Sequence, residues 1–206
     1  PKVLKPGQVK KLFTVAQTKE EWIKLIPYMS FLFFAGARPE ELAAGSEKPR
    51  EQDKKNHRFN WRLVDWEFDS KVTGGIIYNQ PIFEDGVQIS KGARDRKPEF
   101  SACGVAWMRW WAEKCNGDKL PTSGRMYFQR RPWSALRKAA EVEWSHDVAR
   151  HSFTSYAHHN GNWDVVEDYW LRKCGHTADT YKKYYENQQS QKDCEAYFSI
   201  IPPEKK

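Results

Sequence analysis

Apolar residues recur at helical spacing over most of the chain. Near the N-terminus, the pattern predicts a helix that follows Pro6 and ends near Gln17, and a second helix that runs from Thr18 to Phe34. A threonine followed by acidic residues is a typical helix start. The second helix is apolar on most faces towards its end, so we expect it to be buried.

In the rest of the chain, a group of predicted strands is followed by a series of predicted helices. Helical patterns cover residues 102–115, 132–140, 147–158, 163–173, 177–187 and 192–200. Strand-like patterns cover residues 61–68, 75–78, 86–90 and 97–100. The last two segments flank a charged turn with Lys91 near its start. The sequence therefore predicts an α+β fold, mostly helical, with a small antiparallel β-sheet and a β-hairpin that carries Lys91.

Length and composition favour one globular domain. The chain has 206 residues, of which 39% are hydrophobic and 30% charged, so it is neither a disordered tail nor a membrane protein. No apolar run approaches the roughly 20 residues that a membrane helix needs. We expect a single domain over residues 1–206, with a linker at 1–6, an exposed charged loop at 45–60, and a C-terminal helix and tail at 192–206.

The net charge suggests the kind of binding partner, and the cysteine spacing suggests the cellular location. A formal net charge of +7 favours an acidic partner, of which nucleic acid is the commonest, although a solvated basic surface explains the charge equally well. Cys103, Cys115, Cys174 and Cys194 are widely separated and form no CxxC pair. We therefore expect reduced thiols in a cytoplasmic protein.

Several side chains could together cleave a DNA strand. This reaction needs a nucleophile, cations that stabilise the transition state, and an acid for the leaving 5′ oxygen. A tyrosine can attack phosphorus and store the bond as a phosphotyrosine. Arg38 and Arg150 can each hold non-bridging phosphate oxygens in bidentate fashion, and Lys91 can protonate the leaving oxygen.

The first half of the chain carries two segments that resemble motifs of the tyrosine recombinase, or phage integrase, family. GARPEEL at residues 36–42 resembles the family's first arginine box, with Arg38 as its arginine and Glu41 as a supporting residue. Ser-Lys at residues 90–91 resembles the β-hairpin lysine of the family. The resemblance thus implies catalytic roles for Arg38 and Lys91.

The second half carries the remaining motifs in the family's order. RHSF at residues 150–153 resembles the second arginine box, with Arg150 catalytic and His151 supporting. Gly-His at residues 175–176 resembles the Gly-His that follows it and implies a catalytic His176. Tyr185, nine residues after His176, matches the usual place of the nucleophile. The ordered motifs together cover nearly the whole chain.

The resemblance implies a catalytic domain with a defined reaction. Such a domain is a site-specific DNA recombinase of a mobile element, which cleaves and rejoins double-stranded DNA through a 3′-phosphotyrosine intermediate. We expect no cofactor and no metal, because the histidines and cysteines do not have the spacing of a common zinc site. The resemblance also implies a tetramer on DNA, with residues from Lys192 onward exchanged between neighbours. We expect the family's N-terminal core-binding domain to be absent from this chain.

Two other functions fit the same residues. One is a catalytically degenerate DNA-binding module of the same fold, and the other is an enzyme similar to type IB topoisomerases. The family commonly has a histidine three residues before the second arginine, and this chain has Asp147 there, with His146 beside it. Asp147 can orient Arg150 or His151, or act as a base, and His146 is the alternative.

More than one tyrosine is a candidate for the nucleophile. Tyr181, Tyr184 and Tyr185 lie within about one helical turn of each other. Adjacent helical residues differ by about 100° in direction, so Tyr184 and Tyr185 cannot both face one site. We predict Tyr185 as the nucleophile, with Tyr184 as the alternative.

Overall fold

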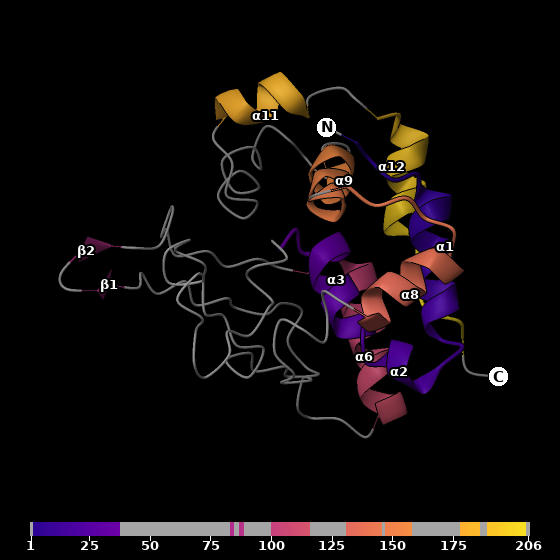
Figure 1. Cartoon of the computed structure of the whole chain (residues 1–206). Helices are drawn as coiled ribbons and strands as arrows, with labels where there is room; N and C mark the ends of the chain where they lie inside the picture. Colours follow the sequence, from indigo (N-terminus) through magenta and orange to yellow (C-terminus); the bar gives the residue numbers. More distant parts are fainter. Residues whose placement is uncertain are drawn as a thin grey trace.

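A computed structural model of the chain describes residues 2–37, 83–84, 87–88, 100–115, 131–145, 147–157, 178–185 and 189–204. Figure 1 shows its helical part with α3 near the middle and α1, α8 and α12 along one side. The helices are α1 (Pro6–Ala16), α2 (Glu20–Ile23), α3 (Ile26–Phe34), α6 (Ala102–Cys115), α8 (Arg131–Ala139), α9 (Val148–Ala157), α11 (Ala178–Tyr184) and α12 (Gln191–Phe198).

Most of the predicted helices that fall in the described part are confirmed. α6 has the predicted bounds, and α8 and α9 differ from the prediction by one residue at each end. α1 and α12 lie within about two residues of their predicted limits, and α11 lies inside the helix predicted over residues 177–187. Apolar spacing and local breakers were therefore sufficient to locate these helices.

The single helix predicted from Thr18 to Phe34 is wrong. The segment forms two helices, α2 and α3, with a turn between them, and the N-cap of α2 is Lys19. Pro27 lies in the first turn of α3. Proline has no backbone N–H and its ring clashes with the carbonyl of the preceding turn, so a helix that continued through it would lose a hydrogen bond.

The predicted α+β fold, with an antiparallel sheet and a lysine-bearing hairpin, is also wrong. The described part is helical, and its extended pairing is confined to the two-residue strands β1 (Phe83–Glu84) and β2 (Val87–Gln88). The residues between them are Asp-Gly, the sequence best suited to a two-residue turn. This pairing is too short to be the predicted sheet and falls before Lys91.

Helix α3 is the centre of the hydrophobic core. Every residue of α3 is buried, and the helix packs against α6 and α9. Aromatic rings fill the space around it: the ring of Phe13 on α1 stacks on that of Phe34 at 5.2 Å and lies 4.6 Å from that of Trp107 on α6. Because α1, α8 and α12 also contribute to this one cluster, the core holds α9 firmly against the end of α3.

Several predicted segments lie outside the described residues. They are the charged loop at 45–60, the strands at 61–68 and 75–78, and the helix at 163–173. Among the helices that the structure describes, none has the length and apolar character needed to cross a membrane.

Candidate functional site

Helix α9 carries the second arginine motif, and its start is shaped by Asp147. The φ of Asp147 is 58°, in the left-handed region that aspartate tolerates better than most residues. The carbonyl oxygen of Asp147 accepts a hydrogen bond from the backbone N–H of His151 at 2.9 Å. Asp147 therefore begins the helix that presents Arg150 and His151.

The guanidinium of Arg150 is held at the end of α3. Arg150 is only 3% exposed, and its Nη1 donates a hydrogen bond of 2.7 Å to the carbonyl oxygen of Gly36. A buried charge is costly unless hydrogen-bonded groups surround it, and this carbonyl supplies one such group. Gly36 is the first residue of the GARPEEL segment, so the contact joins Arg150 to the start of that segment.

The conformation of Gly36 is one that a larger residue would not adopt easily. Its φ is 63°, and a Cβ atom at this position would lie 2.5 Å from Cδ1 of Phe153 on α9. Phe153 is itself 1% exposed, so its ring has little room to move. In the sequence, a glycine directly after a buried apolar run was the signal for this close approach.

The predicted nucleophile lies next to a histidine of the second arginine motif. Nδ1 of His151 and the hydroxyl oxygen of Tyr185 are 2.6 Å apart, and the ring centroids are 5.6 Å apart. His151 belongs to α9, whereas Tyr185 directly follows α11. Two segments that are 34 residues apart thus meet at one hydrogen bond.

Tyr184 and Tyr185 have opposite surroundings. Tyr185 is 3% exposed, whereas Tyr184 is 43% exposed. The difference is the one expected of adjacent helical residues that point in different directions. Of the two, Tyr185 is the one that lies beside the second arginine motif.

The other predicted site residues cannot be placed relative to this pair. Arg38, Glu41, Lys91, His146 and His176 lie outside the described residues. The described part of the site consists of Asp147, Arg150, His151 and Tyr185, with Gly36 as an added member.

The N-terminal segment, predicted as a linker, packs on the same helix. Leu4 is completely buried; its N–H donates to Oγ of Ser152 at 3.0 Å, and its carbonyl accepts from the hydroxyl of Tyr156 at 2.9 Å. Burial raises the pKa of Tyr156. This phenol therefore remains a donor at neutral pH, and the chain just before α1 helps to hold α9 in place.

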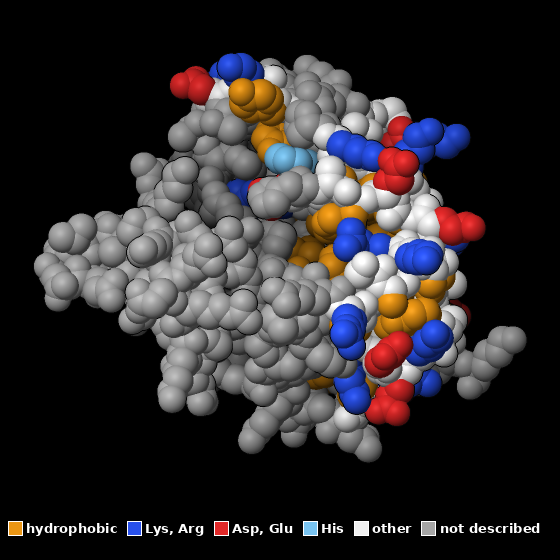
Figure 2. Space-filling model, in the orientation of Figure 1, with side chains coloured by type: hydrophobic (Ala, Val, Ile, Leu, Met, Phe, Trp, Pro, Cys, Tyr) orange, Lys and Arg blue, Asp and Glu red, His pale blue; other side chains and the backbone are white. Residues whose placement is uncertain are grey.

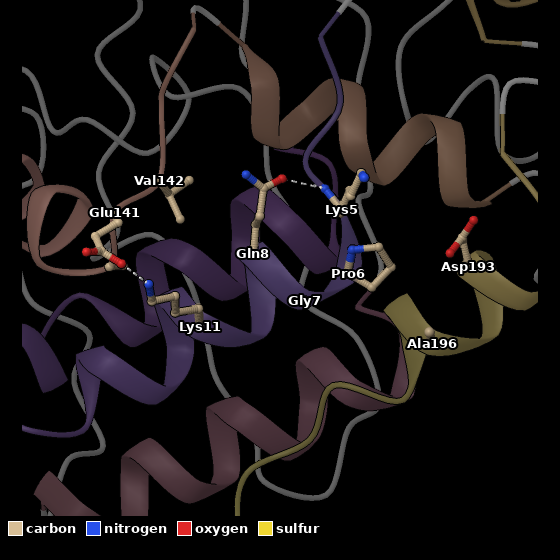
Figure 3. A pocket seen from close by; sticks show the side chains of 10 residues that line it. Lys5, Pro6, Gly7, Gln8, Lys11, Glu141, Val142, Asp193 and Ala196 are labelled. Carbon is tan, nitrogen blue, oxygen red and sulfur yellow. Dashed lines mark hydrogen bonds and ion pairs between the residues drawn. The ribbon is translucent and has the colours of Figure 1, made fainter.

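A hollow among the described residues lies away from the described part of the predicted site. It is an open groove of about 620 Å³ beside α1 and α12, and none of the predicted catalytic residues lines it. Figure 3 shows Lys11 of α1 reaching Glu141 at its edge, with Asp193 of α12 at the opposite end. Basic and acidic side chains alternate over the described face in Figure 2, so this face shows no uniformly basic patch.

The comparisons with known proteins give no family. No protein-family model, no curated protein and no solved structure matches the chain. Among the described residues, no group of three histidine, cysteine, aspartate or glutamate side chains could hold a metal ion.

Proposed function

We propose that the protein is a site-specific DNA recombinase that cleaves and rejoins DNA through a 3′-phosphotyrosine intermediate. The observation that carries the proposal is the 2.6 Å contact between His151 and Tyr185. The residue before His151 on the same helix is the buried Arg150. A tyrosine hydroxyl beside a proton acceptor is an arrangement suited to attack on a phosphodiester, and a nearby helix that carries an arginine can supply a phosphate ligand once the site opens.

The remaining groups enter the proposal through the motif resemblance. Arg38 and Arg150 would hold the non-bridging oxygens, while Lys91 would protonate the leaving 5′ oxygen and His176 would support the phosphate. The partner is double-stranded DNA, and the net charge of +7 supports an acidic partner. Strand exchange would be carried out by a tetramer on DNA, each protomer cutting one strand.

A trapping experiment tests the proposal. The protein is incubated with a pool of nicked duplexes of random sequence, in which the fragment downstream of the cleavage site is lost and rejoining fails. We expect a covalent protein–DNA band under denaturing conditions, and sequencing of the trapped DNA would give the preferred site. Tyr185→Phe should abolish the band, whereas Tyr184→Phe should retain it. A band that persists in Tyr185→Phe would reject the assigned nucleophile.

One observation favours a second candidate, a DNA-binding module of this fold without catalysis. Tyr185 and Arg150 are each only 3% exposed, so a phosphodiester could reach them only after the site opens. Asp147 also occupies the place where the family has a histidine. Retention of the same DNA pool in a native gel, without any covalent band, would favour this module. A covalent band with relaxation of supercoiled DNA but no strand exchange would indicate a topoisomerase-like enzyme.

A further inference from the structure

We propose that His151 is the general base that takes the proton from the Tyr185 hydroxyl during strand cleavage. This inference rests on the proposed function, because it names the proton acceptor of the same reaction. It assigns to the residue after the second arginine a task for which Asp147 and His146 were the sequence-based candidates.

The distance between the two side chains suits proton transfer. Nδ1 of His151 lies 2.6 Å from the Tyr185 oxygen, within the range of about 2.6–3.2 Å in which a base can abstract a proton. An imidazole has an ordinary pKa of about 6.5, and in the neutral tautomer with its proton on Nε2 the Nδ1 atom accepts the hydrogen bond from the Tyr185 hydroxyl. A phenol, with an ordinary pKa near 10, is a weak nucleophile at neutral pH unless such a group removes its proton.

The position of the imidazole is set by a helix that is fixed on several sides. The backbone N–H of His151 is bonded to the carbonyl of Asp147, and the preceding Arg150 is bonded to Gly36. The following Ser152 accepts a hydrogen bond from Leu4. A base fixed in this way loses little further freedom when the reaction begins. His151 is also partly exposed, so the ring can release its proton to water.

The reaction balances with this base. The Tyr185 oxygen gives its proton to Nδ1 of His151 and forms a bond to phosphorus. The bond between phosphorus and the 5′ oxygen breaks, and that oxygen leaves with a proton from an acid, for which Lys91 is the candidate. The products are a 3′-phosphotyrosine, a free 5′-hydroxyl and a protonated His151. Rejoining reverses each of these transfers.

Two substitutions separate a base from a group that only positions the tyrosine. His151→Asn keeps a hydrogen-bonding group near the position of Nδ1, but an amide cannot accept the tyrosine proton at neutral pH. His151→Ala removes the side chain and leaves a space beside Tyr185. We expect both variants to form the covalent complex about a hundredfold more slowly or worse, while circular dichroism shows that each variant remains folded at the assay temperature. Added imidazole should restore His151→Ala severalfold, because it can occupy that space, but should not restore Tyr185→Phe.

A substrate with sulfur in place of the bridging 5′ oxygen completes the test. The sulfur leaves without protonation, so this substrate compensates for a lost acid but not for a lost base. Both His151 variants should therefore stay slow on it, while Tyr184→Phe reacts at the rate of the unmodified protein on either substrate. A His151→Asn rate within about threefold of the unmodified protein would overturn the base role and leave the recombinase proposal intact. The absence of any covalent complex in the unmodified protein, on both substrates, would reject the proposed function itself.

Discussion

The side chain of Arg150 and the backbone of Gly36, 114 residues apart in sequence, are joined by a hydrogen bond of 2.7 Å. This contact links α9, which carries the second arginine motif, to the end of α3, which leads into the first. It depends on a backbone conformation at Gly36 that turns the carbonyl towards Arg150. The stability of the protein should therefore be sensitive to this glycine.

Replacement of Gly36 by alanine should destabilise the protein. The φ of 63° is unfavourable for alanine, and the new Cβ would lie 2.5 Å from the Phe153 ring. Together these effects should lower the free energy of unfolding by about 2–4 kcal/mol, measured by urea denaturation followed by circular dichroism.

Gly7→Ala is the matched control for this change. Gly7 lies in α1, and a Cβ atom there would meet nothing within 4 Å. Alanine is a better helix former than glycine, so this variant should be unchanged or more stable by up to about 1 kcal/mol. Equal stabilities for Gly36→Ala and Gly7→Ala would contradict the close approach at Gly36.

The hydroxyl of Tyr197 should contribute measurably to stability. Tyr197 on α12 is completely buried and donates a hydrogen bond of 2.5 Å to the carbonyl of Phe33 on α3. Its ring stacks on Tyr156 of α9 at a centroid distance of 4.4 Å. Tyr197→Phe keeps the stacking but removes a donor from a buried carbonyl, which should cost about 1–3 kcal/mol of unfolding free energy.

Tyr184→Phe provides the control for that substitution as well. Tyr184 is 43% exposed, so water can replace any hydrogen bond that its hydroxyl makes. Its loss should change the free energy of unfolding by no more than about 0.5 kcal/mol. If Tyr197→Phe were equally mild, the bond to Phe33 would have no energetic importance.

Alkaline pH should weaken the fold through Cys103. Burial raises the pKa of the Cys103 thiol to about 11, although a 3.0 Å contact with the Ser101 hydroxyl opposes this effect. Between about pH 9 and about pH 11 the unfolded chain loses this proton while the folded protein keeps it. The contribution of this thiol to the free energy of unfolding is therefore fully present below about pH 9. The free energy of unfolding should fall by about 2–3 kcal/mol as the pH rises to about 11.

Cys103→Ala tests the assignment of this loss. Burial also raises the pKa of Tyr156 and of Tyr197. These tyrosines therefore lower the free energy of unfolding above about pH 10 both in the unmodified protein and in Cys103→Ala. The difference between the unmodified protein and Cys103→Ala isolates the thiol. Urea denaturation at several pH values should give a shallower decline for the variant, and parallel curves would exclude Cys103 as the cause.

The two adjacent tyrosines should react differently with a phenol-modifying reagent. Tyr184 is 43% exposed and Tyr185 only 3%. Brief treatment with tetranitromethane, followed by peptide mapping with Tyr184→Phe and Tyr185→Phe as references, should show nitration of Tyr184 well before Tyr185. Equal rates would mean that Tyr185 is not enclosed in solution.

The sequence by itself located α1, α6, α8, α9, α11 and α12, because apolar spacing, prolines and glycines act over a few residues. It failed where local patterns were ambiguous. The apolar run before Gly36 concealed the break imposed by Pro27. The strand patterns at residues 86–90 and 97–100 predicted a hairpin around Lys91, whereas the described strand pairing joins Phe83–Glu84 to Val87–Gln88.

Only the tertiary structure decided which side chains meet. The sequence required Tyr184 and Tyr185 to point in different directions, but the packing of the whole chain determined that Tyr185 is enclosed beside His151. The bond from Arg150 to Gly36 likewise depends on how α9 packs against α3. Such contacts join residues many positions apart, and a local pattern carries no information about the distance between their atoms.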